Sequence, residues 1–518
     1  MGSAKYIDRV GSIERNIREL AILAVASIPP WEPTPARLIP TLDPWKVAAD
    51  LINAIREGVH NALALIGSPA RLRVSSPLTV DRNAAVERAV SAPETRLTRV
   101  GRKVAKRLGP MTQTGQRVAS GGLQPALQIR RDGLDPAPEL GEVRASTGLR
   151  TMLNVFGVPV HLVTRYSDVK AVLADHERFS NGQPAGFVMP GAPPLSADEA
   201  ADPQAGNLLA LDPPEHQRLR RMLTGEFTTR RMTRLQPRIA EIVEQQLDEL
   251  ERHGAPADLV SMFALPIPSL VICELLGVPY SDREDFQRRS DSQLNLSLPF
   301  AERYELQRDS HDYMRSLVKQ ARSHPDDDML GMLVREHGDT LTDQELTAIC
   351  GLLLLAGHET TSSMLGLGPL ALLRHPDQLA AMRDDPDRVS PAIEELLRYL
   401  SILHHSIPRI TTADVEICGV TIPAGELVLA SLAGANRDPA FFGDPDILDI
   451  HRDAASHIAF GHGVHHCIGA PLARMELRIA LPALLRRFPH LALAEDFETV
   501  KYHSFHLIYG LQSLAVRW

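Results

Sequence analysis

The pattern of hydrophobic and polar positions predicts a mainly helical chain from about residue 130 onward. Apolar positions recur with helical spacing from about 213 to 400. The longest apolar run, AICGLLLLAG, lies within a predicted helix over 341–375, which opens with Thr342 and Glu345 in capping-box spacing. Because a membrane-spanning helix needs about 20 apolar residues, this run predicts a buried helix instead.

Short strand-like stretches interrupt the helices. VPVHLVTRY at 158–166 is rich in valine and typical of a strand. The segment 167–177 then predicts a helix with Ser167 as its N-cap. ADVEICGVTIPAGELVLAS, which ends at Ser431, predicts strands around turns at Gly419 and Gly425. We therefore expect a mainly α fold with a small β portion.

Residues 1–125 have a different character and predict an extension, partly helical at 13–28 and 47–67. RLTRVGRKVAKRL, starting at Arg96, carries six basic residues and no acidic one. Such a segment could contact an acidic membrane surface or another protein. A solvated linker is the simpler interpretation. The sequence pattern indicates no function for this extension. The remaining residues, 126–518, are expected to form the main domain.

Composition narrows the choice of function. A formal net charge of −9 over 518 residues argues against general nucleic-acid binding. Hydrophobic residues make up 44% and charged residues 23%, which is ordinary for a globular protein. The four cysteines lie far apart and form no CxxC pair, a usage typical of a reducing compartment. With no signal-peptide pattern at the start, we expect a cytoplasmic protein.

Three histidines and one cysteine stand within FGHGVHHCIG, residues 460–469, and suggest a metal. A structural zinc site commonly needs four ligands, and no cysteine pair elsewhere completes one. The alternative is a glycine cradle around one axial thiolate, with Cys467 just before a predicted helix that has Pro471 near its first turn. A helix N-terminus favours a negative charge, so we expect a lowered pKa for Cys467.

The loop resembles the cysteine-ligand loop of the cytochrome P450 family, F-G-x-G-x-H-x-C-x-G. Every fixed residue type is present: Phe460, Gly461, Gly463, His465, Cys467 and Gly469. The resemblance implies the cytochrome P450 fold, with haem (heme b, iron protoporphyrin IX) between a long central helix and the helix after the loop. It implies that Cys467 is the iron ligand, and that Phe460, Gly461, His465 and Gly469 contact haem.

AGHETT, in the middle of the predicted 341–375 helix, resembles the family's A-G-x-[DE]-T motif. The resemblance implies that Glu359 and Thr360 relay protons to dioxygen, with Ala356 and Gly357 over the haem. On the residues alone, Thr360 could instead bond back to a helix carbonyl and kink the helix.

Two further stretches fit the same family. DPPEHQRLRRML places His216 and Arg220 four residues apart on one helix face, and IPRITTADVE supplies Arg409. The resemblance implies that these three residues and His465 bind the haem propionates. SPAIEELLRYLS, with Ser390 as its expected N-cap, contains a pair of the family's E-x-x-R type. This structural pair is Glu395 and Arg398, with Arg452 as its expected third member.

The resemblance implies a monooxygenase that inserts one atom of O2 into a hydrophobic small molecule. No GxGxxG fingerprint for a dinucleotide occurs, so electrons are expected from a separate ferredoxin and ferredoxin reductase. An acidic partner would dock near Arg220, Arg221, Arg474 and Arg478. Substrate contacts are expected around Phe187 and Met189, from Leu294 to Leu298 and from Leu403 to Ile407.

Two other functions stay open on the sequence. One is a peroxide-dependent or non-oxidative haem-thiolate enzyme, which the Glu359-Thr360 pair disfavours. The other is a haem-binding sensor or electron-transfer protein with a second axial ligand, for which His358 is the nearest candidate.

Overall fold

The structure is a computed structural model, and it describes residues 127–153, 159–182, 204–279, 282, 300–503 and 506–518. The predicted extension over 1–125 lies outside the described residues, so its expected helices stay predictions. The described α-helices are α6 (Pro138–Ala145), α7 (Tyr166–Ala174), α9 (Glu215–Thr224), α10 (Thr229–His253), α11 (Pro266–Leu276), α13 (Phe300–Ser323), α14 (Met329–His337), α15 (Asp343–Leu373), α16 (Pro376–Asp384), α17 (Val389–Leu400), α18 (Leu432–Ala435) and α19 (Ala470–Arg487).

The largest sheet has five strands in the order β3-β4-β10-β7-β5. Its strands are β3 (Leu149–Leu153), β4 (Pro159–Val163), β5 (Phe179–Ser180), β7 (Ile407–Thr411) and β10 (Leu427–Ala430). Strand β10 runs parallel to β4 and antiparallel to β7, pairing Val428 with both His161 and Arg409. Smaller pairings join β1 (Arg131–Asp132) to β2 (Asp135–Pro136), β8 (Val415–Ile417) to β9 (Val420–Ile422), and β12 (Ala515–Arg517) to both β11 (Ala492–Leu493) and β6 (Ala257–Asp258). The predicted fold class, mainly α with a small β portion, is confirmed.

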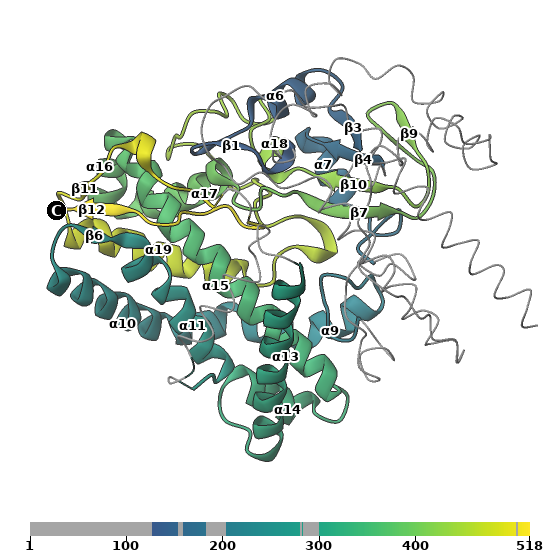
Figure 1. The fold of residues 1–518 in the computed structure, drawn as a ribbon, viewed down its shortest axis with the longest axis horizontal. Coiled ribbons are helices and arrows are strands. Elements are labelled where there is room, and N and C mark those ends of the chain that lie inside the picture. Colours follow the sequence, from purple (N-terminus) through teal and green to yellow (C-terminus); the bar gives the residue numbers. More distant parts are fainter. Residues whose placement is uncertain (1–126, 154–158, 183–203, 280–281, 283–299, 504–505) are drawn as a thin grey trace, which may run out of the picture. The chain divides into compact units, whose positions relative to one another are not determined.

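Helix α15 runs through the helical part of the molecule, with α10, α11, α13 and α19 around it (Figure 1). These helices and α17 share one large cluster of buried apolar side chains, which includes Leu247, Phe263, Leu365, Leu396 and Leu481. Burial of so much apolar surface stabilises the fold and holds α15 between the sheet side and the outer helices. Among the described residues, no helix combines the length and the apolar character needed to cross a membrane.

The capping box of α15 is confirmed. The Thr342 hydroxyl accepts a hydrogen bond from the backbone N–H of Glu345, and the Glu345 carboxylate accepts one from the N–H of Thr342. These two bonds satisfy donors that a helix start leaves unpaired. The two bonds therefore fix where α15 begins, and with it the position along the helix of Ala356, Glu359 and Thr360.

Two expected helix starts are wrong. Helix α7 begins at Tyr166, and Ser167 is not its N-cap, because the first free N–H, that of Tyr166, donates to Asp438 at 2.8 Å. Helix α17 begins at Val389 without Ser390 as a cap, since a short 3-10 turn capped by Asp385 runs directly into it. In both cases a contact or turn outside the expected cap position sets the start.

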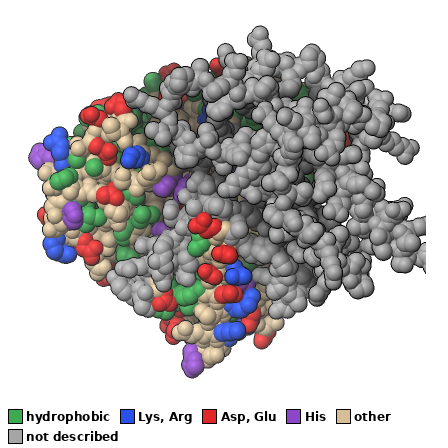
Figure 2. Space-filling view, viewed as in Figure 1, with side chains coloured by type: hydrophobic (Ala, Val, Ile, Leu, Met, Phe, Trp, Pro, Cys, Tyr) green, Lys and Arg blue, Asp and Glu red, His purple; other side chains and the backbone are tan. Residues whose placement is uncertain are grey.

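Acidic and basic side chains are interspersed on the face drawn in Figure 2, including the lower tip formed by α13 and α14 (Figures 1 and 2). Arg322 at the end of α13 donates to Asp343 at the start of α15, and Arg315 lies 3.8 Å from Asp312 within α13. Exposed pairs of this kind contribute little to stability, so the helices here are held mainly by their apolar faces.

Candidate functional site

The loop before α19 is closed by backbone hydrogen bonds. The N–H of Cys467 donates to the carbonyl of Phe460 at 3.0 Å, and the N–H of Gly461 donates to Ile458 at 2.9 Å. Gly463 has a φ of +75°, and a Cβ at this position would lie 2.4 Å from the carbonyl oxygen of Leu173. Glycine is therefore required at 463 both by the backbone conformation and by the close approach of α7.

Cys467 lies three residues before the start of α19, as expected, but its pKa differs from the expectation. Desolvation by the surrounding protein raises the pKa of the thiol, although the N–H groups of Gly469 and Ala470 and the charge of Arg220 act to lower it. The prediction that the pKa of the Cys467 thiol is lowered is therefore wrong for the protein without haem. The residue is nevertheless exposed to solvent, although the surrounding protein desolvates its sulfur.

Basic side chains brace the loop from two directions. Arg220 of α9 donates to the carbonyl of His466 at 2.6 Å. The Arg474 guanidinium lies 4.5 Å from the centre of the Phe460 ring, and it also donates to Glu394. Burial opposes ionisation of Glu394, but hydrogen bonds from His457 and Arg474 outweigh it and hold its pKa at about 2. Glu394 is thus an anionic anchor that the sequence reasoning missed, although it stands directly before Glu395.

The four residues expected to bind carboxylates come together between α9, β7 and the loop. The rings of His216 and His465 lie 4.1 Å apart, and both His216 and Arg409 are buried. Burial lowers the pKa of His465 to about 3, with His216 and Arg409 adding to the effect. Burial likewise lowers the pKa of Arg409 to about 10, opposed by Asp212. The buried cation of Arg409 and the N–H groups of the two neutral imidazoles favour an anion among them.

The middle of α15 exposes one stripe. Ala356 is exposed although most of this helix is buried, and Thr360, one turn later, is half-buried. The Thr360 hydroxyl donates to the carbonyl of Ala356 at 2.7 Å. Gly357 does not share this direction, since a Cβ there would lie 2.9 Å from Ile272 of α11. Its lack of a side chain lets α11 approach α15, so a haem contact at Gly357 could involve only its backbone.

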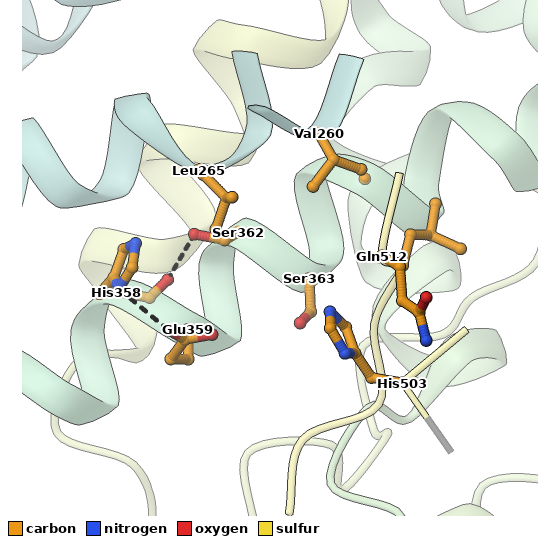
Figure 3. A pocket seen from close by; sticks show the side chains of 10 residues that line it. Val260, Leu265, His358, Glu359, Ser362, Ser363, His503 and Gln512 are labelled. Carbon is orange, nitrogen blue, oxygen red and sulfur yellow. Dashed lines mark hydrogen bonds and ion pairs between the residues drawn. The ribbon is translucent and has the colours of Figure 1, made fainter. Parts of the chain in front are cut away.

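Glu359 faces a cavity of about 290 Å³ next to that stripe. Three segments line the cavity (Figure 3). They contribute Val260 and Leu265 from the segment before α11, His358, Glu359, Ser362, Ser363 and Gly366 from α15, and His503, Leu511 and Gln512 from the C-terminal segment. The Oε1 atom of Glu359 lies 3.2 Å from Nδ1 of His358. No motif marked His503 or Gln512, because only the folded chain brings the C-terminal segment against α15.

Only some of the predicted substrate contacts lie within the described residues. Phe187, Met189 and Leu294 to Leu298 lie outside the described residues. Leu403 and Ile407 are half-buried and pack against the apolar cluster beneath the five-stranded sheet. They stay predictions as substrate contacts.

The sequence profile described as Cytochrome P450 matches residues 124–508. Cytochrome P450 FAS1 from Rhodococcoides fascians is 50% identical over 392 residues, which are 76% of this chain and 98% of that protein. The chain belongs to the cytochrome P450 family. Vitamin D(3) 25-hydroxylase from Pseudonocardia autotrophica is 41% identical over 74% of this chain and 93% of that protein. The crystal structure of CYP105P1 in complex with filipin I matches with a TM-score of 0.71 and 37% identity, covering 77% of this chain and 99% of that chain.

Membership makes the chain a cytochrome P450 monooxygenase with haem as its cofactor, and the residues present fit that group. Nδ1 of His216 and Nε2 of His465 are buried and have no hydrogen-bond partner among the described residues. Such atoms are costly unless a ligand satisfies them, and propionates would do so. An exposed Ala356 inside a buried helix and an exposed Cys467 inside a desolvated loop likewise fit a large flat group between α15 and α19.

Proposed function

We propose that this cytochrome P450 is a ferredoxin-dependent monooxygenase that inserts one oxygen atom from O2 into a hydrophobic small molecule in the cytoplasm. The observation that carries the proposal is the pairing, in one fold, of an exposed Cys467 before α19 with the Glu359-Thr360 pair in α15. A relative named as a vitamin D(3) hydroxylase supports an apolar substrate. The ferredoxin donor, the hydrophobic substrate and the cytoplasmic location are proposed because they are typical of the bacterial members of the family.

In this proposal Cys467 would hold the iron as a thiolate, since metals bind the deprotonated sulfur. His216, Arg220, Arg409 and His465 would hold the propionates, and the backbone of the Phe460–Gly469 loop would contact the haem. When bound, haem supplies the iron at which dioxygen is activated, and a thiolate ligand favours cleavage of the O–O bond.

In this proposal Thr360 and Glu359 transfer protons, and the apolar side chains around them exclude bulk water. Thr360 donates to the carbonyl of Ala356 in the structure, so its hydroxyl has to rotate to donate elsewhere. Glu359 stands next to it and can resupply the proton from its cavity side. The apolar side chains around the middle of α15 exclude bulk water, which strengthens these polar interactions.

The proposed ferredoxin surface is formed by Arg220, Arg221, Arg474 and Arg478. Arg474 and Arg478 both donate to Glu394, so part of their charge is neutralised within the protein. Arg221 is exposed and forms no ion pair with any described residue, so its charge can attract an acidic partner. We therefore expect modest affinity with a marked dependence on salt.

The test is the absorption spectrum of the dithionite-reduced holoenzyme with carbon monoxide, for the native chain beside Cys467→Ala. Thiolate ligation gives a strongly red-shifted Soret band that the variant lacks. A band at the position of ordinary histidine-ligated haem in freshly prepared native protein would refute ligation by Cys467 and the assigned reaction with it.

A further inference from the structure

Residues on one face of α15 form part of the cavity wall. Glu359, Ser362, Ser363 and Gly366 follow the spacing i, i+3, i+4, i+7, which places them along one stripe. Ala356 and Thr360 form the neighbouring stripe, and Glu359, three residues after Ala356, is the surface neighbour of Ala356. Glu359 is therefore the residue that connects the cavity with the exposed stripe of α15.

The wall of the cavity is apolar at Val260, Leu265 and Leu511, and its polar groups can hold water. Glu359 is 7% exposed, and its Oε1, which lies 3.2 Å from Nδ1 of His358, accepts no hydrogen bond from the described residues. A buried carboxylate oxygen that accepts no hydrogen bond is unfavourable, and water in the adjoining cavity can supply one. The volume of about 290 Å³ far exceeds the ~10–15 Å³ that one water requires. Ser363, His503 and Gln512 supply further polar atoms around the space (Figure 3).

Two neighbouring histidines lie at the C-terminal side of this space. His503 lines the cavity and is half-buried, while His506 is buried, and their rings lie 4.2 Å apart. Burial lowers the pKa of His506 to about 4, His503 lowers it further, and the carboxylate of Glu359 opposes both. His506 is therefore close enough to Glu359 to sense its charge, and it is neutral near pH 7. Its backbone is fixed because Nε2 of His404 binds its carbonyl at 2.8 Å.

We propose that this cavity is the proton entry route of the enzyme, in which His503 and His506 pass protons from solvent to Glu359. A neutral imidazole accepts a proton on one ring nitrogen and releases the proton of the other, then returns to its first tautomer. Glu359 takes the proton and gives it up toward Thr360, so no group is altered after a cycle and solvent supplies every proton. The inference rests on the proposed function. His503 and His506 act through Glu359 and touch neither haem nor substrate.

The first test is structural and independent of turnover. A high-resolution crystal structure of the holoenzyme would contain ordered waters that link Glu359 to His503 through the cavity. A dry cavity, or one filled by a protein side chain, would overturn the route whatever the activity.

The second test uses NADPH-driven reduction of O2 without added substrate, supported by a plant-type ferredoxin and its reductase. Reduction of O2 to two waters takes four electrons and four protons, whereas hydrogen peroxide takes two of each. In His503→Phe we expect the share of O2 reduced to water to fall about tenfold, less than the ~10²–10⁴ that a directly acting acid contributes because water can partly replace an imidazole. We also expect a larger solvent isotope effect. His490→Phe, the same change at an exposed histidine, should change neither quantity.

The outcomes separate the two proposals. If the reduced, carbon-monoxide-bound native protein lacks the red-shifted band, the proposed function fails. If the band is present and Glu359→Gln lowers the water share while His503→Phe leaves it and the isotope effect unchanged, only the route is refuted. Should His503→Phe fail to fold, Ser363→Val replaces a hydroxyl between Glu359 and His503 in the cavity wall with methyl groups, and a native water share in that variant would overturn the route.

Discussion

Glu395 and Arg398 are both completely buried, and the guanidinium of Arg398 donates to the Glu395 carboxylate at 2.7 and 2.8 Å. Arg398 also donates to the carbonyls of Asn436 and Pro445, and Arg452 donates to Glu395 at 3.3 Å. The predicted group of three is confirmed. It joins α17 to the irregular segment that leads from α18 toward the cysteine loop, so its effect on the site is structural.

Removing one charge of this group should be severe. In Glu395→Gln the buried Arg398 loses its counter-charge, and we expect the free energy of unfolding to fall by about 3–5 kcal/mol, the usual cost of breaking a buried ion pair. Glu244→Gln is the matched control, because Glu244 binds Arg487 at an exposed position and its loss should cost at most ~1 kcal/mol. Urea denaturation measures both. Equal losses would show that the buried pair contributes no more than a surface pair.

The sequence predicted those parts of the site that depend on neighbours along the chain. The capping box of α15, the Glu395–Arg398 pair and the glycines around Cys467 all follow from local spacing, and the structure contains each of them. Other features depend on distant segments and left no local signal. Asp438 sets the start of α7, Ile272 explains Gly357, and the fold alone brings His503 against α15.

The thiol pKa shows why local reasoning fails in another way. The helix N-terminus does favour the thiolate of Cys467, through the N–H groups of Gly469 and Ala470. Desolvation is nevertheless the larger effect, and it depends on how much of the whole protein surrounds the sulfur. The sequence indicates the first effect and gives no measure of the second.

Thr360→Ala should uncouple electron use from oxygen insertion without harming the fold. The variant removes the hydroxyl beside Glu359, so we expect the hydrogen peroxide formed per NADPH oxidised to rise several-fold, since a positioned proton donor contributes about 10²–10⁴ in rate. Thr347→Ala is the control, because Thr347 makes the same i−4 hydrogen bond in the same helix, to Asp343 at 2.6 Å. Peroxide assays decide the matter. A similar rise in both variants would assign the effect to helix distortion.

Arg409→Met should affect the two forms of the protein in opposite directions. Burial of Arg409 is unfavourable without an anion, as its lowered pKa indicates, so the haem-free variant should be as stable as the native protein or more stable. The same variant should lose haem more readily, because a propionate loses its cation. Arg437→Met is the control: Arg437 is buried but bonded to Asp446 and to the carbonyl of Tyr399, so its loss should destabilise both forms. Thermal unfolding with and without haem, and haem transfer to apomyoglobin, measure the two effects. Destabilised haem-free Arg409→Met would contradict the assignment.

Gly463→Ala should damage the loop more than its backbone strain alone explains. A positive φ costs about 1–2 kcal/mol for a residue with a Cβ. At Gly463 the new methyl group would also lie 2.4 Å from the Leu173 carbonyl, so α7 or the loop has to move. Gly425→Ala is the control, since Gly425 also has a positive φ but no atom within 4 Å of the added Cβ. Denaturation and the carbon-monoxide spectrum report both effects, and equal losses would show that the contact with α7 relaxes freely.

Acid should destabilise the protein partly through His404. Burial lowers the pKa of this histidine to about 3 in the folded state, with Arg131, His405 and His506 contributing. The unfolded chain binds a proton at this residue below about pH 6.5, whereas the folded protein does not until about pH 3. Stability is therefore lost as the pH falls through this window, by about 2 kcal/mol between pH 7 and pH 5.

His404→Phe cannot bind that proton in either state, so its stability should fall by about 2 kcal/mol less than that of the native protein over the same pH interval. Its stability at pH 7 should be lower, because the hydrogen bond to the His506 carbonyl is lost. His490→Phe, at an exposed position, should keep the native pH dependence. Urea denaturation at pH 7, 6 and 5 measures the difference. If His404→Phe and the native protein lose the same stability on acidification, His404 is not a residue through which acid unfolds the chain.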